Sequence, residues 1–324
     1  MLIGNKRLYP DEAVPVGETN QAFNSRFSLW ANANGLSEPE FLLPIIDRKT
    51  TIESFRFERR FSASGATPPS QELVDSMGPW HYQIEWKNVA TRELKHDLRD
   101  LWLELDWKVH RYRSSLLVDL AAEIAGRSRE QLSVMDVACH CGILSLEFGE
   151  AGFGSVKGLD LRPENIRQAQ FLQDTFRCPS VSFDVVNARN IRGRSADIVF
   201  CGGLLYHVTF PVELMTDLFA ATREVLILDS LCQNHPFSGF HLYDGKDTNQ
   251  SLEGDNAIEL VPTYRAIIDM LRAAGFAEIY EVLGDRALEV PFYKDRNIRS
   301  FVAAKPGSKY LHGMTLRPGP DGPS

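Results

Sequence analysis

Four short runs in the sequence place polar side chains or glycine directly after a segment with a strand-like pattern. They are residues 136–142, 158–163, 181–188 and 196–211. The first predicts a tight turn ahead of a helix, where backbone can approach a ligand. In the second, Asp160 can accept both hydroxyls of a ribose, and in the third Asn187 with the N–H of Ala188 can contact an adenine edge. The fourth brings Tyr206 and His207 to the same edge, so the runs predict a nucleoside site beside a reactive wall.

The polar aromatic residues indicate how such a site could react. His207 is the expected general base, because imidazole changes its protonation state near neutral pH. A role for His207 in capping the following helix stays open. We expect Tyr206 to shape the site, and His241 and Tyr243 to line the acceptor side from a long polar segment at 231–259.

Two runs have some features of metal sites. The Cys-His-Cys run at 139–141 has no second pair of ligands, and zinc takes about four, usually in spaced pairs. His235, His241 and Asp244 lie in an expected loop, where histidines more often face solvent or substrate. We therefore expect no metal.

The hydrophobic pattern predicts the elements that position these residues. After residue 130, short β-branched runs alternate with helix-length segments, which is typical of a parallel sheet with crossover helices. Two amphipathic helices are expected before it, at 91–107 and 108–126. Later helices are expected to start at Pro163 and to stop at Gly275. The expected strands are 133–139, 155–161, 181–187, 196–202, 225–229, 278–283 and 298–304.

The same pattern divides the chain. We expect an irregular segment at 1–79 with a linker at 63–70, an aromatic and helical accessory segment at 80–129, the main domain at 130–305 with an insertion at 231–259, and a loose tail at 306–324. Trp80, His81 and Tyr82 form an aromatic cluster. The cluster is either a lid that contacts substrate or an anchor that packs the accessory segment on the sheet.

At the four runs the sequence resembles the class I S-adenosylmethionine-dependent methyltransferases, over residues 133–304. The resemblance implies an α/β fold, a Rossmann-like doubly wound seven-stranded sheet, with S-adenosylmethionine as cofactor and S-adenosylhomocysteine as product. Ala138 and His140 depart from the family's Asp-x-Gly-x-Gly-x-Gly loop, of which Gly142 remains. The missing glycines also disfavour a nicotinamide dinucleotide, whose pyrophosphate needs Gly-x-Gly-x-x-Gly. The resemblance implies that the methionine end of the cofactor is held by Asp136, Ala138, His140 and Gly142, and that its ribose side is contacted by Asp160 and Leu161. It also implies that the adenine is contacted by Asn187 and Ala188, and that the methyl-donor side is lined by Cys201 and Gly202.

A finer resemblance connects the chain with the tRNA wobble-uridine carboxymethyl transferases. It rests on Asp106-Trp-Lys108 and on Gly203-Leu-Leu-Tyr206-His207 with Pro211. It implies that Lys108 and Tyr206 hold the extra carboxylate of a carboxylated cofactor, although Leu103 stands where that family has an aromatic residue. Transfer to tRNA is therefore one alternative function, and a non-catalytic ligand-binding fold is another.

Composition favours a small-molecule acceptor over nucleic acid. The 324 residues carry 35 Lys and Arg against 43 Asp and Glu, for a net charge of −8, whereas affinity for nucleic acid depends on neutralising phosphates. The absence of long apolar runs and the five cysteines within apolar runs indicate a cytoplasmic protein with reduced thiols. We expect methyl transfer to an oxygen, nitrogen or carbon of a metabolite.

Overall fold

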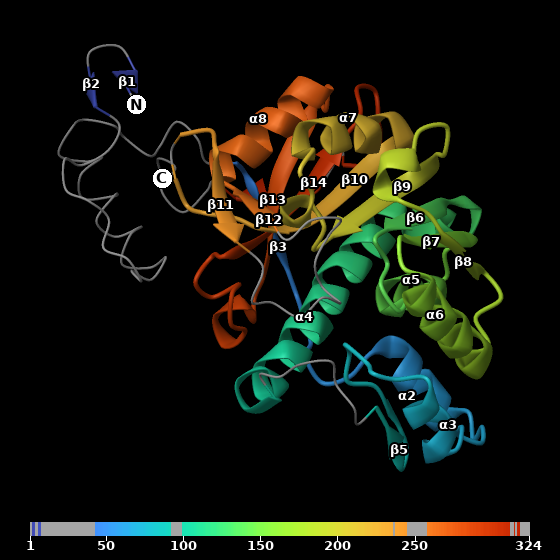
Figure 1. Cartoon of the computed structure of the whole chain (residues 1–324). Coiled ribbons are helices and arrows are strands. Elements are labelled where there is room, and N and C mark those ends of the chain that lie inside the picture. The colour runs from blue at the N-terminus through green and yellow to red at the C-terminus, as the bar shows by residue number, and fades with distance from the viewer. Residues whose placement is uncertain are drawn as a thin grey trace.

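A nine-stranded sheet forms the centre of the protein (Figure 1). The computed structural model describes residues 2–3, 6–7, 43–91, 99–235, 237–244, 258–311, 314 and 316–317. The strand order is β15-β3-β13-β14-β10-β9-β6-β7-β8. The strands are β3 (Ile45–Arg48), β6 (Ser133–Val137), β7 (Ser155–Asp160), β8 (Val181–Val185), β9 (Ala196–Gly202), β10 (Thr222–Leu231), β13 (Glu278–Gly284), β14 (Ile298–Ala304) and β15 (Leu316–Arg317).

The chain reverses its direction across the sheet between β6 and β9. From β6 it proceeds through β7 to β8 on one side, and then returns to β9 and β10 on the other, with all five strands parallel. In an open α/β sheet, ligands bind beyond the carboxyl ends of the strands at this reversal. The four sequence runs lie at the carboxyl ends of β6, β7, β8 and β9, so the fold brings all of them to one edge.

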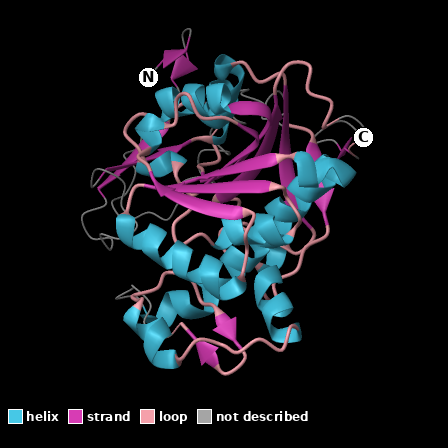
Figure 2. Cartoon of the chain, turned by 90° about the vertical axis from the view of Figure 1, so that its right-hand side faces the viewer, coloured by secondary structure: helices cyan, strands magenta, loops and turns pink. Residues whose placement is uncertain are grey.

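Helices cover both faces of the sheet, as Figure 2 shows. On one face, side chains of the helices α4, α5 and α6 join one buried cluster, and on the other face those of α7 and α8 join a second cluster. Pro163 opens α6 and Gly275 caps α8 in the left-handed conformation, as their types predict. The helices are α4 (Arg99–Ala125), α5 (Ile143–Glu150), α6 (Pro163–Phe176), α7 (Pro211–Ala221) and α8 (Tyr264–Ala274).

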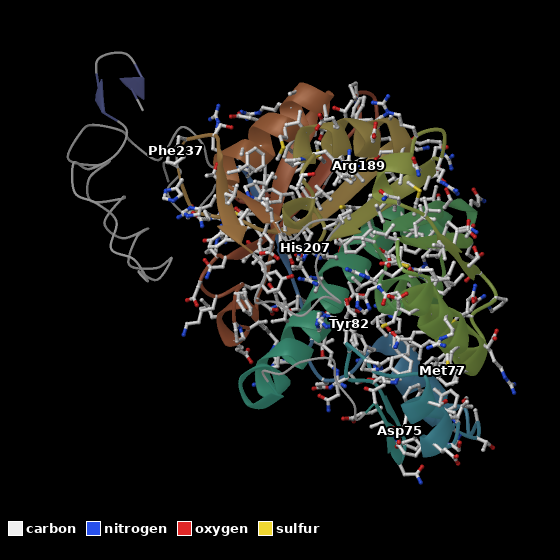
Figure 3. All side chains as sticks on the ribbon, in the orientation of Figure 1. Asp75, Met77, Tyr82, Arg189, His207 and Phe237 are labelled. Atoms are coloured by element: carbon white, nitrogen blue, oxygen red, sulfur yellow. The ribbon has the colours of Figure 1, made fainter. Side chains whose placement is uncertain are left out.

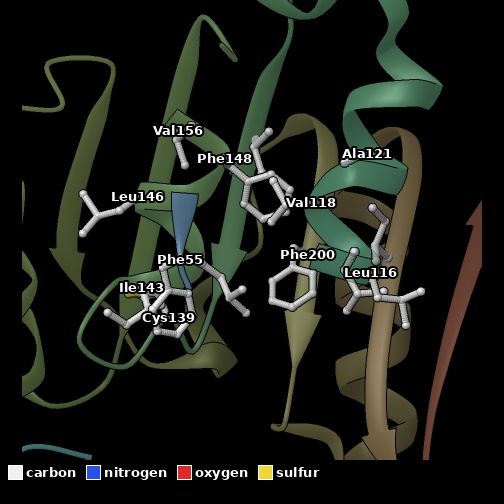
Figure 4. Close-up of a cluster of buried hydrophobic side chains, with 14 of the residues drawn as sticks. Phe55, Leu116, Val118, Ala121, Cys139, Ile143, Leu146, Phe148, Val156 and Phe200 are labelled. Atoms are coloured by element: carbon white, nitrogen blue, oxygen red, sulfur yellow. The ribbon is translucent and has the colours of Figure 1, made fainter. Parts of the chain in front are cut away.

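The larger cluster fixes the long helix α4 against the sheet (Figure 4). Phe148 of α5 lies 5.7 Å from Phe200 of β9 between ring centroids, and both rings are fully buried. Leu116 and Ala121 of α4 are buried in the same cluster. Burying a large apolar side chain stabilises a fold by about 1.5–3 kcal/mol, so this layer holds the loop after β6 on a rigid base.

The region before the main domain is more regular than the sequence pattern predicts. Within residues 43–79, β3 joins the main sheet, and the helices α2 (Arg56–Ala63) and α3 (Gln71–Ser76) flank the expected linker. The expected seven strands are all present, but β3 and β15 extend the sheet to nine. Both additions are short segments distant in sequence from their neighbours, and the residues of β3 carry no local alternation that distinguishes them.

Two other expectations need correction. The helices expected at 91–107 and 108–126 are one continuous helix, α4, because no proline or glycine interrupts the pattern at residue 107; residues 92–98 lie outside the described part of the chain. The polar insertion expected at 231–259 contains the strand β11 (Phe240–Asp244), which pairs antiparallel with β12 (Ile258–Pro262) in a hairpin that extends past residue 259. Among the described residues, no helix is long and apolar enough to cross a membrane.

Candidate active site

The loop after β6 contacts the end of β7 through backbone. Ala138, His140 and Gly142 all have positive φ, at 62°, 51° and 81°, a conformation that costs non-glycine residues energy. A Cβ at Gly142 would lie 2.5 Å from the Phe183 ring, so only glycine fits there. The N–H of His140 donates to Asp160 Oδ2 at 2.9 Å. Two of the predicted cofactor segments are therefore joined by a hydrogen bond.

Asp160 is the centre of a small hydrogen-bond network. Its Oδ1 accepts from the N–H of Arg162 at 2.9 Å and from Asn165 Nδ2 at 3.0 Å, in addition to the His140 contact on Oδ2. A carboxylate has about four lone-pair sites, so these three donors leave capacity for a ligand hydroxyl. Leu161 follows it with 41% of its surface exposed, which leaves an apolar surface next to a buried carboxylate.

The end of β8 supplies the third predicted segment. Asn187 accepts a hydrogen bond from the N–H of Arg189 at 2.9 Å and so caps a short 3-10 helix that begins at Ala188. The exposed Val185 precedes it in β8 and is paired in register with Asp160. Apolar surface and hydrogen-bonding groups thus alternate along the neighbouring ends of β7 and β8.

Asp136 lies inside the protein. Its side chain is 1% exposed and accepts a hydrogen bond from the Ser145 hydroxyl at 2.6 Å. Burial, with a smaller contribution from the neighbouring charge of Asp160, raises the pKa of Asp136 to about 7, while the Ser145 hydrogen bond opposes the shift. The carboxyl group therefore orients the start of α5, and it contacts Ser145 in place of solvent.

The predicted base has a carboxylate partner. His207 Nδ1 lies 3.1 Å from Glu259 Oε1, and both side chains are partly buried. Tyr206 packs beside the imidazole with 4.1 Å between ring centroids. The 3-10 turn Leu205–His207 follows β9, and Glu259 comes from β12, so His207 lies between the sheet edge and the hairpin (Figure 3). A carboxylate at this distance is placed to orient an imidazole.

Cys201 and Gly202 close β9 just before this turn. Cys201 is fully buried, and burial raises the pKa of its thiol. A Cβ at Gly202 would approach the Phe200 ring to 2.5 Å. All five cysteines are buried and free, so Cys201 acts as a small apolar residue of the strand.

Gln233 holds the two predicted acceptor residues of the hairpin. Its Nε2 donates to the Tyr243 hydroxyl at 2.6 Å, and its Oε1 lies 3.1 Å from His241 Nδ1. The His241 and Tyr243 rings are stacked with 4.9 Å between centroids.

Burial, with a smaller effect from His241, lowers the pKa of His235 to about 4, so His235 is neutral at physiological pH.

The aromatic cluster of the accessory segment divides between two roles. Trp80 is fully buried, donates from Nε1 to the Val74 carbonyl at 2.9 Å and packs on Phe171 of α6, an environment that favours the anchor alternative for this residue. His81 and Tyr82 instead face the loop after β6. Their rings lie 4.9 and 5.6 Å from the His140 ring, between centroids. Figure 3 shows Tyr82 beside α4.

Lys108 lies on α4, more than 20 residues in sequence from every other predicted site residue. Glu289 is held by Arg286, whose hydrogen bond lowers the pKa of Glu289, and the charge of Lys108 adds to that effect. The charge of Lys108 thus acts on one carboxylate of this chain. The predicted joint role of Lys108 and Tyr206 stays a prediction.

Sequence reasoning missed four residues of this region: Asn165, Gln233, Glu259 and His110, whose ring lies 4.1 Å from that of Tyr82. Each acts through a contact with a residue distant in sequence, or through a helix turn, and none belongs to a motif. Within the described parts of the chain, no group of three or more His, Cys, Asp and Glu side chains has the arrangement of a metal site.

Comparison with known proteins supports the same family. A family described as a methyltransferase domain matches residues 109–280, which is more than half of the chain. The tRNA U34 carboxymethyltransferase of Wolinella succinogenes is 23% identical over 155 residues, which cover 45% of this chain and 52% of that protein. The protein of the same name from Campylobacter jejuni is 23% identical over 61% of this chain and 67% of its own length. The matches thus span about half to two thirds of these relatives.

A solved structure has the same fold. The N-terminal domain of EvdMO1, crystallised in the presence of S-adenosylhomocysteine and D-fucose, aligns with a TM-score of 0.53 over 72% of this chain and 94% of that domain, at 17% identity. The reversal of strand order, the four segments at one edge and the family match agree. The chain belongs to the class I S-adenosylmethionine-dependent methyltransferases.

Proposed function

We propose that this protein transfers a methyl group from S-adenosylmethionine to an oxygen, nitrogen or carbon of a small-molecule acceptor, by in-line displacement. The cofactor supplies an activated methyl group on a sulfonium. The chain must therefore hold donor and acceptor about 3–3.5 Å apart and remove a proton where the nucleophile carries one.

The residues at the sheet edge suit the adenosyl group. Asp160, with a free lone-pair site, would accept a ribose hydroxyl, and the exposed Leu161 would cover one side of the adenine. Asn187 and Ala188 would contact the adenine edge. The loop from Ala138 to Gly142 would hold the methionine end, with His140 in place of a glycine.

The contact between His207 and Glu259 carries the proposal of a general base. With Nδ1 3.1 Å from Glu259 Oε1, an imidazole that carries its proton on Nδ1 would have Nε2 available to accept a proton from the acceptor. Glu259 would stabilise the charge that the ring then acquires. The acceptor would lie against the face of the hairpin that carries Glu259 and the stacked His241 and Tyr243.

His207→Ala tests the base. Turnover is expected to fall by about 10² to 10⁴, the usual contribution of a general base, while S-adenosylhomocysteine affinity in isothermal titration stays close to that of the wild type. Glu259→Gln should give a smaller loss with the same unchanged affinity, because it affects only the orientation of the ring. Unchanged turnover in His207→Ala would exclude the base role.

The relatives that act on tRNA support a second candidate, carboxymethyl or methyl transfer to tRNA. Titration with S-adenosylmethionine, S-adenosylhomocysteine and the carboxylated cofactor would separate the two candidates. A clear preference for the carboxylated form favours the tRNA candidate and a role for Lys108 and Tyr206. If none of the three compounds binds, both candidates fail, and the chain is a methyltransferase-like fold that does not use this cofactor.

A further inference from the structure

Two arginines share one carboxylate beside the proposed acceptor side. Glu281 Oε1 lies 2.7 Å from Arg296 Nη2 and 3.2 Å from Arg299 Nη1. The side chains of Glu281 and Arg299 are 3% and 4% exposed, and that of Arg296 is 24% exposed. The cluster therefore has a formal charge of +1 in a largely buried place, where an uncompensated charge is costly.

The other nearby carboxylates do not balance this charge. Asp229 and Asp285, which like Arg296 act electrostatically on Tyr112, have cations of their own. Arg113 lies 2.8 Å from Asp229, and Lys49 lies 2.9 Å from Asp285. Among the described residues, Glu281 is thus the carboxylate that pairs with both arginines of the cluster.

The two arginines differ in freedom. Arg299 donates from Nη2 to Asn234 Oδ1 at 2.8 Å and lies 4.3 Å above the Tyr264 ring, so its guanidinium is fixed on several sides. Arg296 contacts Glu281 through Nη2, and its side chain keeps 24% exposure, against 4% for Arg299. Burial and the charge of Arg299 lower the pKa of Arg296. An anion placed on Arg296 would relieve that repulsion.

The cluster lies at the same sheet edge as His207. Arg299 pairs in register with Ser230 near the carboxyl end of β10. From there, Asn234 contacts Arg299, and its neighbour Gln233 contacts His241 and Tyr243. Tyr243 pairs across the hairpin with Glu259, which contacts His207. A continuous series of contacts therefore joins the cluster to the proposed base.

We propose that Arg296, supported by Arg299, binds a carboxylate or phosphate group of the small-molecule methyl acceptor. A guanidinium fork matches both groups and forms charge-assisted hydrogen bonds with them. This inference rests on the proposed function and narrows its substrate class to anionic acceptors. Recognition of one anionic group needs a single positive position, whereas RNA needs an extended basic surface.

The test uses inorganic phosphate and acetate as probes on the full chain, at constant ionic strength. Isothermal titration and the thermal midpoint should show both anions binding to the wild type. Arg296→Gln should weaken that binding by about tenfold or more, the loss typical of a charge-assisted hydrogen bond, and Arg296→Lys by less. Arg286→Gln is the matched control, because Arg286 lies with Arg296 in the segment between β13 and β14 and pairs with its own carboxylate, Glu289, at 2.7 Å.

S-adenosylhomocysteine affinity, measured on the same samples, separates this inference from the proposed function. It should be equal in all variants, which also shows that Arg296→Gln is folded. If the wild type binds phosphate but no S-adenosylhomocysteine, the proposed function fails and the anion site stands. Equal phosphate and acetate binding in wild type and Arg296→Gln, or none in either, overturns the inference.

A second measurement connects the anion to the acceptor. The protein is incubated with tritiated S-adenosylmethionine and a small-molecule extract, and any labelled product is passed over an anion-exchange resin at neutral pH. The product should be retained by the resin. A labelled product that passes through, or one that nuclease destroys, contradicts an anionic small-molecule acceptor. When no label is transferred, the titration alone decides.

Discussion

At the scale of single residues, two aspartates of the same edge have different environments. Asp160 accepts three hydrogen bonds from groups of the loops around it, whereas Asp136 is enclosed and accepts one from Ser145. A carboxylate with several donors and a remaining lone pair can bind a hydroxyl, while burial raises the pKa of an enclosed one. The first therefore suits ligand binding, and the second suits the internal packing of α5.

Asp160→Asn is expected to weaken S-adenosylhomocysteine binding by about 10- to 100-fold, because an amide offers fewer acceptor positions than a carboxylate. Isothermal titration measures the change. Asp184→Asn is the control, since Asp184 lies on the adjacent strand β8 and contacts Lys157 at the surface. Equal affinity in the two variants would show that Asp160 does not contact the ribose.

Asp136 should make stability depend on pH. Its folded pKa of about 7 lies above the ordinary value of 3.8, so the folded state binds more protons than the unfolded state between these values. This contribution is complete below about pH 4 and is lost as pH rises to about 7, by about 1 kcal/mol per pH unit. Urea unfolding at pH 5, 6 and 7 should show a flatter dependence for Asp136→Asn than for the wild type. Parallel curves would contradict the shift.

At the scale of elements, polar contacts attach residues 55–82, which include the start of the accessory segment, to the main domain. Gln168 of α6 donates from Nε2 to the carbonyls of Met77 and Pro79, at 2.8 and 3.0 Å. Glu147 of α5 accepts from the N–H of Phe57 and from the Ser114 hydroxyl. These contacts hold the segment that contains His81 and Tyr82 in place, so that both rings lie close to the loop after β6.

Gln168→Met should lower the free energy of unfolding by about 1–3 kcal/mol, because two carbonyls lose their donor in a buried place. It should also speed proteolytic cleavage between α3 and residue 84, since that segment opens more readily. Gln170→Met on the exposed side of the same helix is the control. Urea unfolding and limited proteolysis give both values. Similar behaviour of the two variants would show that the accessory segment is held by other contacts.

At the scale of the whole molecule, the net charge of −8 bears on the choice of acceptor. A protein that binds tRNA through phosphates loses affinity steeply as salt rises. We expect no retention of tRNA at about 50 mM salt, measured by filter binding or electrophoretic shift. Tight retention that weakens as salt rises would favour the tRNA candidate. It would also indicate that this acidic protein has a local basic surface that binds phosphates.

The sequence by itself determined the order of strands and helices in the main domain. The strands at 196–202 and 298–304 coincide with β9 and β14, and Pro163 and Gly275 mark helix ends as expected. These features are local, because strand patterns and end residues depend on neighbours within a few positions. The family resemblance added the roles expected of the polar groups at the strand ends.

Only the tertiary structure decided which distant side chains meet. Glu259 reaches His207 because β12 folds back over the end of β9, and Arg296 and Arg299 share Glu281 because β13 and β14 are adjacent. Likewise, the burial of Trp80 follows from α6 lying against the accessory segment. Contacts of this kind depend on how elements pack, and the sequence of either partner alone carries no periodic signal for them.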